Sequence, residues 1–278
     1  MPKIHPTAIV DDQVKLADDV EIGPYCILRG EITLGSGVQL IASVTLQGPL
    51  TIGSGCVFYP GSSIGFGPQD AKVKFGDPTA GVVIGNDCIF RESSTVHAAS
   101  NDHTPTKVGD RAFFMVNAHI GHDVSVGNDV VLVVNTAIGG HGQIQDRVIL
   151  SGGTMVHQFG RVGKQAMTSG GTMLSNDLPP YFMAVERNTV VGLNMVGMRR
   201  SGMSREEIHA VKSVYSEVFR KNPPRRELLE MLEERAKNSS AVNDIYEFVN
   251  AAKRSICPIG GRRLTRAIDE QTRVEAVE

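Results

Sequence analysis

The sequence predicts a mainly β solenoid followed by a smaller α-helical part, and three observations support this fold class. Large apolar residues recur every six positions over most of the first 180 residues. Glycine directly follows many of them, and there is no tryptophan although hydrophobic residues make up 41% of the chain. After a pair of prolines near residue 180, the spacing of apolar residues becomes that of amphipathic helices.

The six-residue repeat begins at Ile4 and reaches Ile64 without a miss, and after an interruption it continues from Ile84 to Val162. A period of six fits neither a helix, with 3.6 residues per turn, nor a lone strand, with a period of two. It fits a short strand plus a turn, repeated as one face of a prism. Three such units make a coil of 18 residues, so residues 18 apart are expected on adjacent strands, about 4.8 Å apart.

The interior of such a tube accounts for several compositional features. The residue four places after each large apolar residue is mostly small or aliphatic, so both positions are expected to face inward. Cys26, Cys56 and Cys88 occupy the small position, and we interpret them as core residues rather than disulfide partners. A narrow interior also predicts that aromatic side chains are excluded. The glycines suit turns that need a positive φ or a close backbone approach.

A break is predicted at Asp177-Leu-Pro-Pro-Tyr181, because consecutive prolines remove backbone donors. Ser204 and Glu207 then have the spacing of a capping box that opens a helix. Two further helices are expected before residue 253 from their apolar spacing. We therefore expect three parts, namely a β-helix over 1–180, a helical domain over 181–257 and a flexible tail over 258–278.

The overall charge and hydropathy exclude several classes of protein. The 28 basic and 30 acidic residues nearly balance, so the net charge gives no reason to expect nucleic-acid binding. The longest aliphatic run, Val130 to Val134, is far shorter than the roughly 20 residues of a membrane span. The first residues lack the pattern of a signal peptide. We expect a cytoplasmic protein without a transmembrane segment.

Candidate catalytic residues lie in the second half of the solenoid, which contains His97, His119, His122, His141 and His157. The 18-residue coil places His122 beside Gly140, Gly140 beside Gln158, and Asp123 beside His141. A histidine next to a carboxylate can act as a general base near neutral pH. A glycine N–H one coil away can donate to a developing oxyanion. Together these groups suit acyl transfer to a hydroxyl group without a serine or cysteine nucleophile.

The hexads resemble the left-handed parallel β-helix of the hexapeptide-repeat acyltransferases. The left-handed coil is implied by this resemblance, because parallel crossovers are ordinarily right-handed. Members of this superfamily are typically trimers, so the resemblance also implies a homotrimer.

A narrower resemblance rests on five strings that occur in order, Asn117-Ala-His119-Ile-Gly-His122-Asp123, Gly139-Gly140-His141, Val156-His157-Gln158-Phe159, Asp177-Leu-Pro-Pro-Tyr181 and Gly202-Met-Ser204-Arg205-Glu206. These look like the acyl-carrier-protein:UDP-N-acetylglucosamine O-acyltransferase family, which takes the first step of lipid A biosynthesis. The resemblance implies transfer of a 3-hydroxyacyl group from acyl carrier protein, through its phosphopantetheine arm, to the sugar 3-hydroxyl. No cofactor and no metal are implied.

The same resemblance assigns roles to individual residues. The general base falls on His122, its orienting carboxylate on Asp123 and the oxyanion N–H on Gly140. Substrate contacts fall on Asp70, Lys72, His97, His119 and His141 for the acceptor sugar, on Gln158, Asn194 and Arg200 for the nucleotide, and on His157. Gly170 matches a position where side-chain size limits acyl length. The sequence departs from the family pattern at several places. These are Gly121, the pair Ala98-Ala99 after His97, the polar loop over 101–106, and Val196 and Ser201 near the nucleotide end.

Three alternatives remain open at this point. An N-acyltransferase of the same pathway shares the solenoid, but normally has an N-terminal uridine-binding domain, whereas the hexads here begin at Ile4. A zinc enzyme similar to the γ-class carbonic anhydrases would use His119, His122 and His141 as ligands. A non-enzymatic scaffold gives no reason for the alignment of His122 with Gly140.

Overall fold

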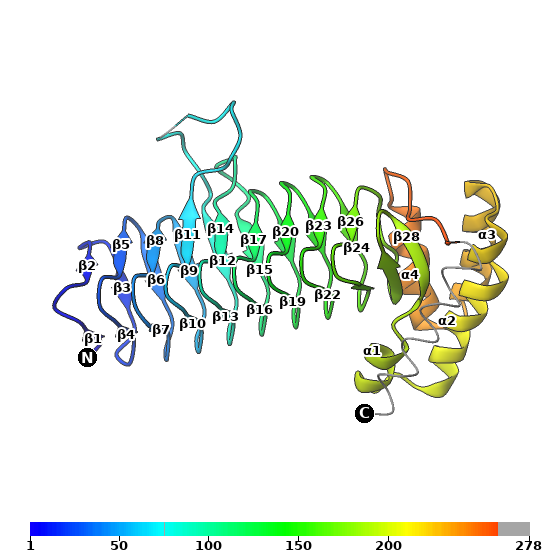
Figure 1. Cartoon of the computed structure of the whole chain (residues 1–278), viewed down its shortest axis with the longest axis horizontal. Coiled ribbons are helices and arrows are strands. Elements are labelled where there is room, and N and C mark those ends of the chain that lie inside the picture. Colours follow the sequence, from blue (N-terminus) through cyan, green and yellow to red (C-terminus); the bar gives the residue numbers. More distant parts are fainter. Residues whose placement is uncertain (75, 261–278) are drawn as a thin grey trace.

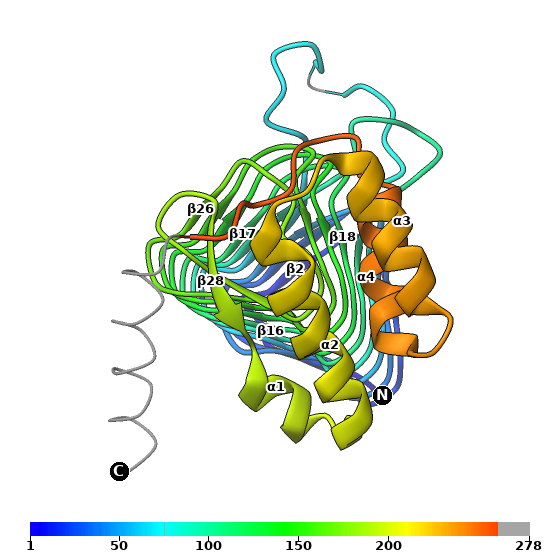
Figure 2. The same cartoon turned by 90° about the vertical axis from the view of Figure 1, so that its right-hand side faces the viewer.

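The computed structural model describes residues 1–74 and 76–260, which form a long β-helix with helices at its C-terminal end (Figure 1). Three sheets make the faces of the tube, and the end-on view shows their triangular arrangement (Figure 2). We call them sheets A, B and C, in the order in which each coil passes through them.

Sheet A has eleven strands, in the order β1 (Lys3–Ile4), β4 (Glu21–Ile22), β7 (Gln39–Leu40), β10 (Val57–Phe58), β13 (Ile89–Phe90), β16 (Phe113–Phe114), β19 (Val131–Leu132), β22 (Ile149–Leu150), β25 (Met167–Thr168), β27 (Phe182–Val185) and β28 (Thr189–Leu193). Sheet B has nine, namely β2 (Ile9–Val10), β5 (Ile27–Arg29), β8 (Thr45–Gln47), β11 (Ser63–Phe66), β14 (Thr95–His97), β17 (His119–Ile120), β20 (Ala137–Ile138), β23 (Met155–Val156) and β26 (Met173–Leu174). Sheet C has eight, namely β3 (Lys15–Leu16), β6 (Ile32–Leu34), β9 (Leu50–Ile52), β12 (Val82–Ile84), β15 (Thr106–Val108), β18 (Ser125–Val126), β21 (Gln143–Ile144) and β24 (Arg161–Val162).

Adjacent coils pair in the predicted register, for example Ile120 with Ile138 and Ile138 with Val156. Two loops interrupt this register, one over residues 67–81 and one over residues 98–105. The first loop projects well away from the tube above β11 and β12 (Figure 1). The second loop lies between β14 and β15, one coil before His122.

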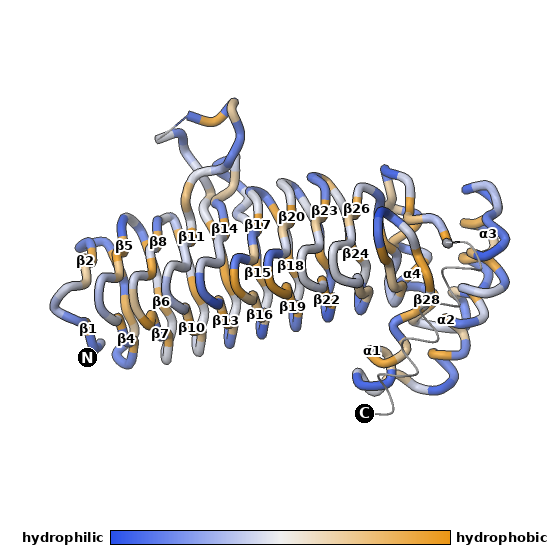
Figure 3. The backbone as a smooth tube through the Cα atoms, in the orientation of Figure 1, coloured by the Kyte–Doolittle hydropathy of each residue, from blue (hydrophilic) through white to orange (hydrophobic). Residues whose placement is uncertain are grey.

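The repeated apolar positions face inward as predicted, and Cys26, Cys56 and Cys88 are fully buried. Apolar and polar segments alternate along each coil (Figure 3). The expected exclusion of aromatics from the interior was wrong. Phe58, Phe90 and Phe114 are buried in successive strands of sheet A, and the rings of the first two stack with centroids 4.7 Å apart. This separation matches the spacing of adjacent strands, so a column of rings fits the tube.

The turns between sheets use two different backbone features. The glycines were expected to provide either a positive φ or a close backbone approach. Close approach applies at Gly121, where an added Cβ would lie 2.9 Å from the nitrogen of Gly140. The left-handed conformation falls two residues later, at Asp123, whose φ is 59°. His141 has the same φ one coil on. Asp and His enter this region more readily than most residues other than glycine.

The C-terminal part contains the expected helices, and it also contains elements that the sequence did not predict. The antiparallel hairpin β27–β28 continues sheet A beyond β25, and a short helix follows it. The helical elements are α1 (Met195–Arg200), α2 (Arg205–Glu217), the 3₁₀ turn η1 (Phe219–Lys221), α3 (Arg225–Ala236) and α4 (Ser240–Asn250). They lie at the end of the tube (Figure 2). No helix among residues 1–74 and 76–260 is long and apolar enough to cross a membrane.

Only half of the predicted capping box forms. The Ser204 hydroxyl accepts a hydrogen bond from the Glu207 N–H, as expected. The Glu207 carboxylate instead accepts hydrogen bonds from the N–H groups of Ser240 and Ala241, at the start of α4. It therefore caps a neighbouring helix, because the packing of α2 against α4 offers unpaired donors that the sequence spacing cannot reveal.

The expected tail over 258–278 lies outside the described residues from 261 onward. Before that point, Pro258 accepts a hydrogen bond from the Val190 N–H, and Gly260 donates one to the Val190 carbonyl. The chain therefore pairs with β28 as far as residue 260.

Candidate active site

His122 and Asp123 form a hydrogen-bonded pair at the turn between sheets B and C. Nδ1 of His122 lies 2.7 Å from Oδ2 of Asp123. The His122 side chain is 13% exposed and that of Asp123 is 7% exposed. The bond to the carboxylate occupies Nδ1, which leaves Nε2 as the nitrogen that can accept a proton. This is the geometry of a general base held by an orienting carboxylate.

Asp123 is also held by the loop over residues 98–105, a contact that the sequence did not predict. The Ser100 hydroxyl donates to Oδ2 at 2.6 Å, and the Asn101 side-chain amide donates to Oδ1 at 2.7 Å. Burial by itself raises the pKa of Asp123. The hydrogen bonds from His122 and Ser100 and the charge of His141 outweigh that effect, so the pKa lies below its ordinary value. The carboxylate is therefore ionised near neutral pH.

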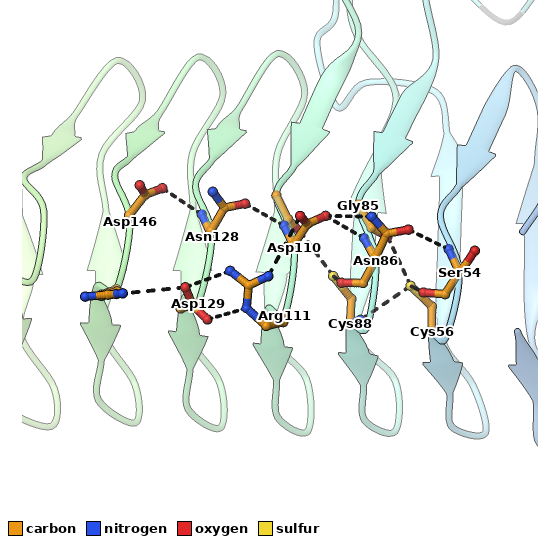
Figure 4. A network of polar contacts seen from close by, with 12 residues as sticks. Ser54, Cys56, Gly85, Asn86, Cys88, Asp110, Arg111, Asn128, Asp129 and Asp146 are labelled. Atoms are coloured by element: carbon orange, nitrogen blue, oxygen red, sulfur yellow. Dashed lines mark hydrogen bonds and ion pairs between the residues drawn. The ribbon is translucent and has the colours of Figure 1, made fainter. Parts of the chain in front are cut away.

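Gly140 lies directly against the His122 ring, one coil later. A Cβ at Gly140 would be 2.5 Å from Nε2 of His122, so only glycine permits this approach. The Gly140 N–H donates no hydrogen bond to any residue in the described part of the chain. At the turn between sheets C and A, the equivalent N–H groups are bonded by side chains of the next coil, as in Asp110 to Asn128 (Figure 4). The N–H of Gly140 is thus available, unlike the N–H groups at the turn between sheets C and A.

The predicted histidines form two edge-to-face pairs around this turn. His122 and His141 have ring centroids 5.1 Å apart, and His97 and His119 have centroids 5.0 Å apart. Nε2 of His141 is 3.6 Å from Oδ2 of Asp123, as the 18-residue coil predicts, and its ring stacks on Phe159. The positions expected side by side do therefore lie side by side.

His97 and His119 are held in uncharged form by their surroundings. Burial lowers the pKa of His97 to about 4, and the nearby His119 and His122 add to this effect. Burial also lowers the pKa of His119. Nδ1 of His97 is buried without a hydrogen-bond partner in residues 1–74 and 76–260, whereas Nδ1 of His119 is 2.7 Å from the Thr95 hydroxyl. A neutral imidazole with a free nitrogen can bind a hydroxyl group.

His157 and Gln158 occupy the next coil after Gly140, where a residue from outside the solenoid reaches them. The Arg254 guanidinium, just beyond α4, donates a hydrogen bond to the Gln158 carbonyl. It also lies 3.4 Å from Nδ1 of His157. No sequence signal linked Arg254 to this turn, because the two segments are almost 100 residues apart.

The other predicted contacts are not assembled with His122 in one chain. Asn194 is buried and caps α1, accepting from the Gly197 N–H, and its amide donates to the Gln165 carbonyl. Arg200 is the exposed last residue of α1, which lies beside the end of sheet A, away from the turn that carries His122 (Figures 1 and 2). Gly170 is exposed, and an added Cβ would approach nothing closer than 3.5 Å.

Asp70 and Lys72 lie in the projecting loop. Oδ1 of Asp70 accepts a hydrogen bond from the Lys72 N–H at 2.9 Å, and the Lys72 side chain is exposed. Neither side chain makes a hydrogen bond or ion pair to the histidines within the part of the chain that the structure describes. Their predicted contact with an acceptor sugar stays a prediction.

His122, Asp123 and His141 each offer a ligand atom within 4.8 Å of the others. A zinc ligand set was considered above, but with His119 in place of Asp123. His119 lies instead in the pair with His97. Two imidazoles and a carboxylate are chemically able to bind zinc, so this grouping defines the alternative that an experiment must test.

Comparison with known proteins agrees with this fold. A family model described as "Udp N-acetylglucosamine O-acyltransferase; Domain 2" matches residues 177–257. An acyl-[acyl-carrier-protein]–UDP-N-acetylglucosamine O-acyltransferase from Sulfurihydrogenibium is 50% identical, over 98% of this chain and all of the relative. The corresponding enzyme from Akkermansia muciniphila is 48% identical over 92% of this chain and all of its own length.

Solved structures lead to the same group. UDP-N-acetylglucosamine acyltransferase from Francisella novicida superposes with a TM-score of 0.89 at 33% identity, over 94% of this chain and 96% of that one. The Moraxella catarrhalis UDP-N-acetylglucosamine O-acyltransferase superposes with a TM-score of 0.87 at 34% identity, over 91% and 99%.

The six-residue repeat, the histidine–carboxylate pair and these matches define a hexapeptide-repeat acyltransferase with a left-handed parallel β-helix, and the predicted fold class is confirmed. More narrowly, the chain belongs to the acyl-[acyl-carrier-protein]–UDP-N-acetylglucosamine O-acyltransferase family. It is an enzyme of the acyltransferase class, as predicted.

Proposed function

We propose that this protein transfers a 3-hydroxyacyl group from acyl carrier protein to the 3-hydroxyl of UDP-N-acetylglucosamine. The single observation that carries the mechanism is the His122–Asp123 pair with the unbonded Gly140 N–H one coil away. Relatives that bear this enzyme's name cover nearly the whole chain and support the choice of substrates.

In the proposed reaction, Nε2 of His122 takes the proton from the sugar 3-hydroxyl while the hydroxyl oxygen attacks the thioester carbonyl carbon. The Gly140 N–H donates to the oxyanion that forms. When this intermediate collapses, the carbon–sulfur bond breaks and the thiolate of the phosphopantetheine arm takes the proton from His122. The histidine returns to its starting form, so no cofactor or metal is needed.

Further residues support binding of both substrates. The neutral His97, with a free nitrogen, and its neighbour His119 suit hydroxyl groups of the acceptor sugar. In the coils that follow His119, the outward-facing positions of sheet B are apolar. Met155 is 52% exposed and Met173 is 43% exposed. An exposed apolar row beside the reaction centre suits an acyl chain, and the open surroundings of Gly170 leave room at the neighbouring turn.

We infer that the active enzyme is a homotrimer. Asn194 and Arg200, which are expected to bind the nucleotide, lie at α1 near the C-terminal end of the tube, away from His122 in the same chain, so a second copy is needed to complete the site. With a chain mass of 29.9 kDa, a trimer has a mass of about 90 kDa. Light scattering coupled to size exclusion measures this mass, and a monomer that is fully active would overturn the proposal. A cytoplasmic location follows from the proposed soluble substrates.

The central test is an acyl-transfer assay with acyl carrier protein and UDP-N-acetylglucosamine. His122→Ala is expected to remove activity while the thermal transition stays in place. His103→Ala is the matched control, because the side chain of this histidine is exposed in the loop after β14 and pairs only with Asp102 among the described residues. Transfer to an amino sugar but not to the hydroxyl acceptor would favour an N-acyltransferase instead.

The zinc alternative rests on the grouping of His122, Asp123 and His141. Metal analysis of protein purified without chelators decides between a zinc enzyme and the metal-free acyltransferase mechanism. Stoichiometric zinc whose removal abolishes activity would overturn the metal-free mechanism. Full activity in the presence of a strong chelator is the result that we expect.

A further inference from the structure

The two loops that interrupt the coil lie against each other beside the His122–Asp123 pair. Ala98 and Ala99 are fully buried at the start of the second loop. The Ala99 carbonyl accepts from the Thr79 hydroxyl at 2.6 Å, and the Ala80 N–H donates to the Asn101 carbonyl at 2.6 Å. The first loop therefore fixes the backbone of the second one at Ser100 and Asn101.

From this fixed backbone, three donors converge on the Asp123 carboxylate. The Ser100 N–H lies 3.1 Å from Oδ1, the Ser100 hydroxyl 2.6 Å from Oδ2, and the Asn101 amide 2.7 Å from Oδ1. The Asp123 N–H in turn donates to the buried Thr106 hydroxyl, where the second loop rejoins the coil. Both oxygens of the carboxylate are thus bonded by the loop, and Oδ2 also faces His122.

We propose that Ser100 and Asn101 are positioning residues for catalysis, which act on His122 only through Asp123. Asp123 has a φ of 59°, and it faces two imidazoles, His122 and His141. A free carboxylate in that position can turn toward either ring. The loop donors hold it so that Oδ2 faces Nδ1 of His122, which fixes the ring with Nε2 over Gly140. This inference rests on the proposed function and adds residues to it.

The geometry separates Ser100 and Asn101 in their expected effects. Ser100→Ala removes one charge-assisted bond and retains the backbone donor, so kcat is expected to fall about tenfold at unchanged KM. Ser100→Thr keeps the hydroxyl and is expected to restore most of the activity. Asn101→Asp places a second carboxylate against Asp123 and is expected to cost more than Ser100→Ala.

A double-mutant cycle tests whether the effect passes through Asp123. In the Asp123→Asn background, Ser100→Ala is expected to have no further effect on kcat, because the bonded carboxylate is already gone. Thr104→Ala, which changes an exposed side chain of the same loop, is the control for general loop damage. Independent effects that multiply, a rise in KM instead of a fall in kcat, or no rescue by Ser100→Thr would each overturn the proposal.

A readout that does not depend on activity keeps this inference distinct from the proposed function. The Nδ1 proton of His122, shared with Asp123, is expected to give a low-field proton resonance that is absent in His122→Ala. Ser100→Ala is expected to broaden or shift it, whereas Thr104→Ala leaves it in place. An unchanged resonance in Ser100→Ala would refute the positioning role even if the enzyme acts on other substrates.

Discussion

Gly140→Ala tests the close approach of the Gly140 backbone to the His122 ring. The added Cβ would lie 2.5 Å from Nε2 and 2.7 Å from Cε1 of His122, whereas ordinary contacts begin at 3.4 Å. The ring must therefore move by about 0.9 Å, since the Gly140 carbonyl is held by a hydrogen bond from the Phe159 N–H of the next coil. A displacement near 1 Å in a catalytic group costs about 100-fold in rate, or about 2.7 kcal/mol in the barrier. Because Gly140 does not have a positive φ, alanine introduces no backbone strain.

The assay is steady-state acyl transfer, with kcat and KM measured separately for each substrate. We expect kcat of Gly140→Ala to fall about 100-fold with a thermal transition close to that of the wild type. Gly192→Ala is the control, because a Cβ at Gly192 meets nothing within 4 Å. If Gly140→Ala retains kcat within twofold, His122 does not need its place over Gly140, and the assignment of the oxyanion site fails with it. An equal loss in Gly192→Ala would point to general damage.

Three further predictions follow from the same structure. Glu207→Ala is expected to cost about 1 kcal/mol of unfolding free energy, because the carboxylate caps α4. Burial raises the pKa of Glu207, but bonds from Ser239 and the α4 backbone outweigh this and lower it. The contribution of Glu207 to the free energy of unfolding is therefore present above pH 4.5 and lost as pH falls through the lowered pKa. Chemical denaturation at several pH values measures this loss. His97 is expected to titrate near pH 4 in an NMR titration and to stay neutral at pH 6. Because this pKa lies below the ordinary 6.5, the free energy of unfolding is expected to fall as pH falls from 6.5 toward 4. A titration midpoint near 6.5 would contradict the burial argument. Arg254→Ala is expected to raise KM for the sugar nucleotide about tenfold at nearly constant kcat, because the guanidinium holds the Gln158 turn; a fall in kcat alone would show that the turn serves the chemistry instead.

The candidate site divides clearly into what linear spacing can reveal and what it cannot. His122, Gly140 and Gln158 follow one another at intervals of 18 residues, so a correct coil length is enough to align them. Ser100 and Arg254 have no such relation to the coil. Ser100 reaches Asp123 from an inserted loop, and Arg254 reaches Gln158 from beyond the last helix. A periodic pattern carries no information about contacts made by segments outside the repeat.

The inward positions of the β-helix, the 18-residue stacking and the buried cysteines could be predicted from the linear repeat, because every coil must obey it. The contacts between segments that are distant in sequence could be found only in the folded chain. The stacked phenylalanines fit because their spacing equals the strand spacing, which volume arguments from composition missed. Glu207 caps a neighbouring helix, and two insertions pack together to hold the catalytic carboxylate. Such contacts depend on where the folded chain places unpaired donors, and only packing in three dimensions determines that.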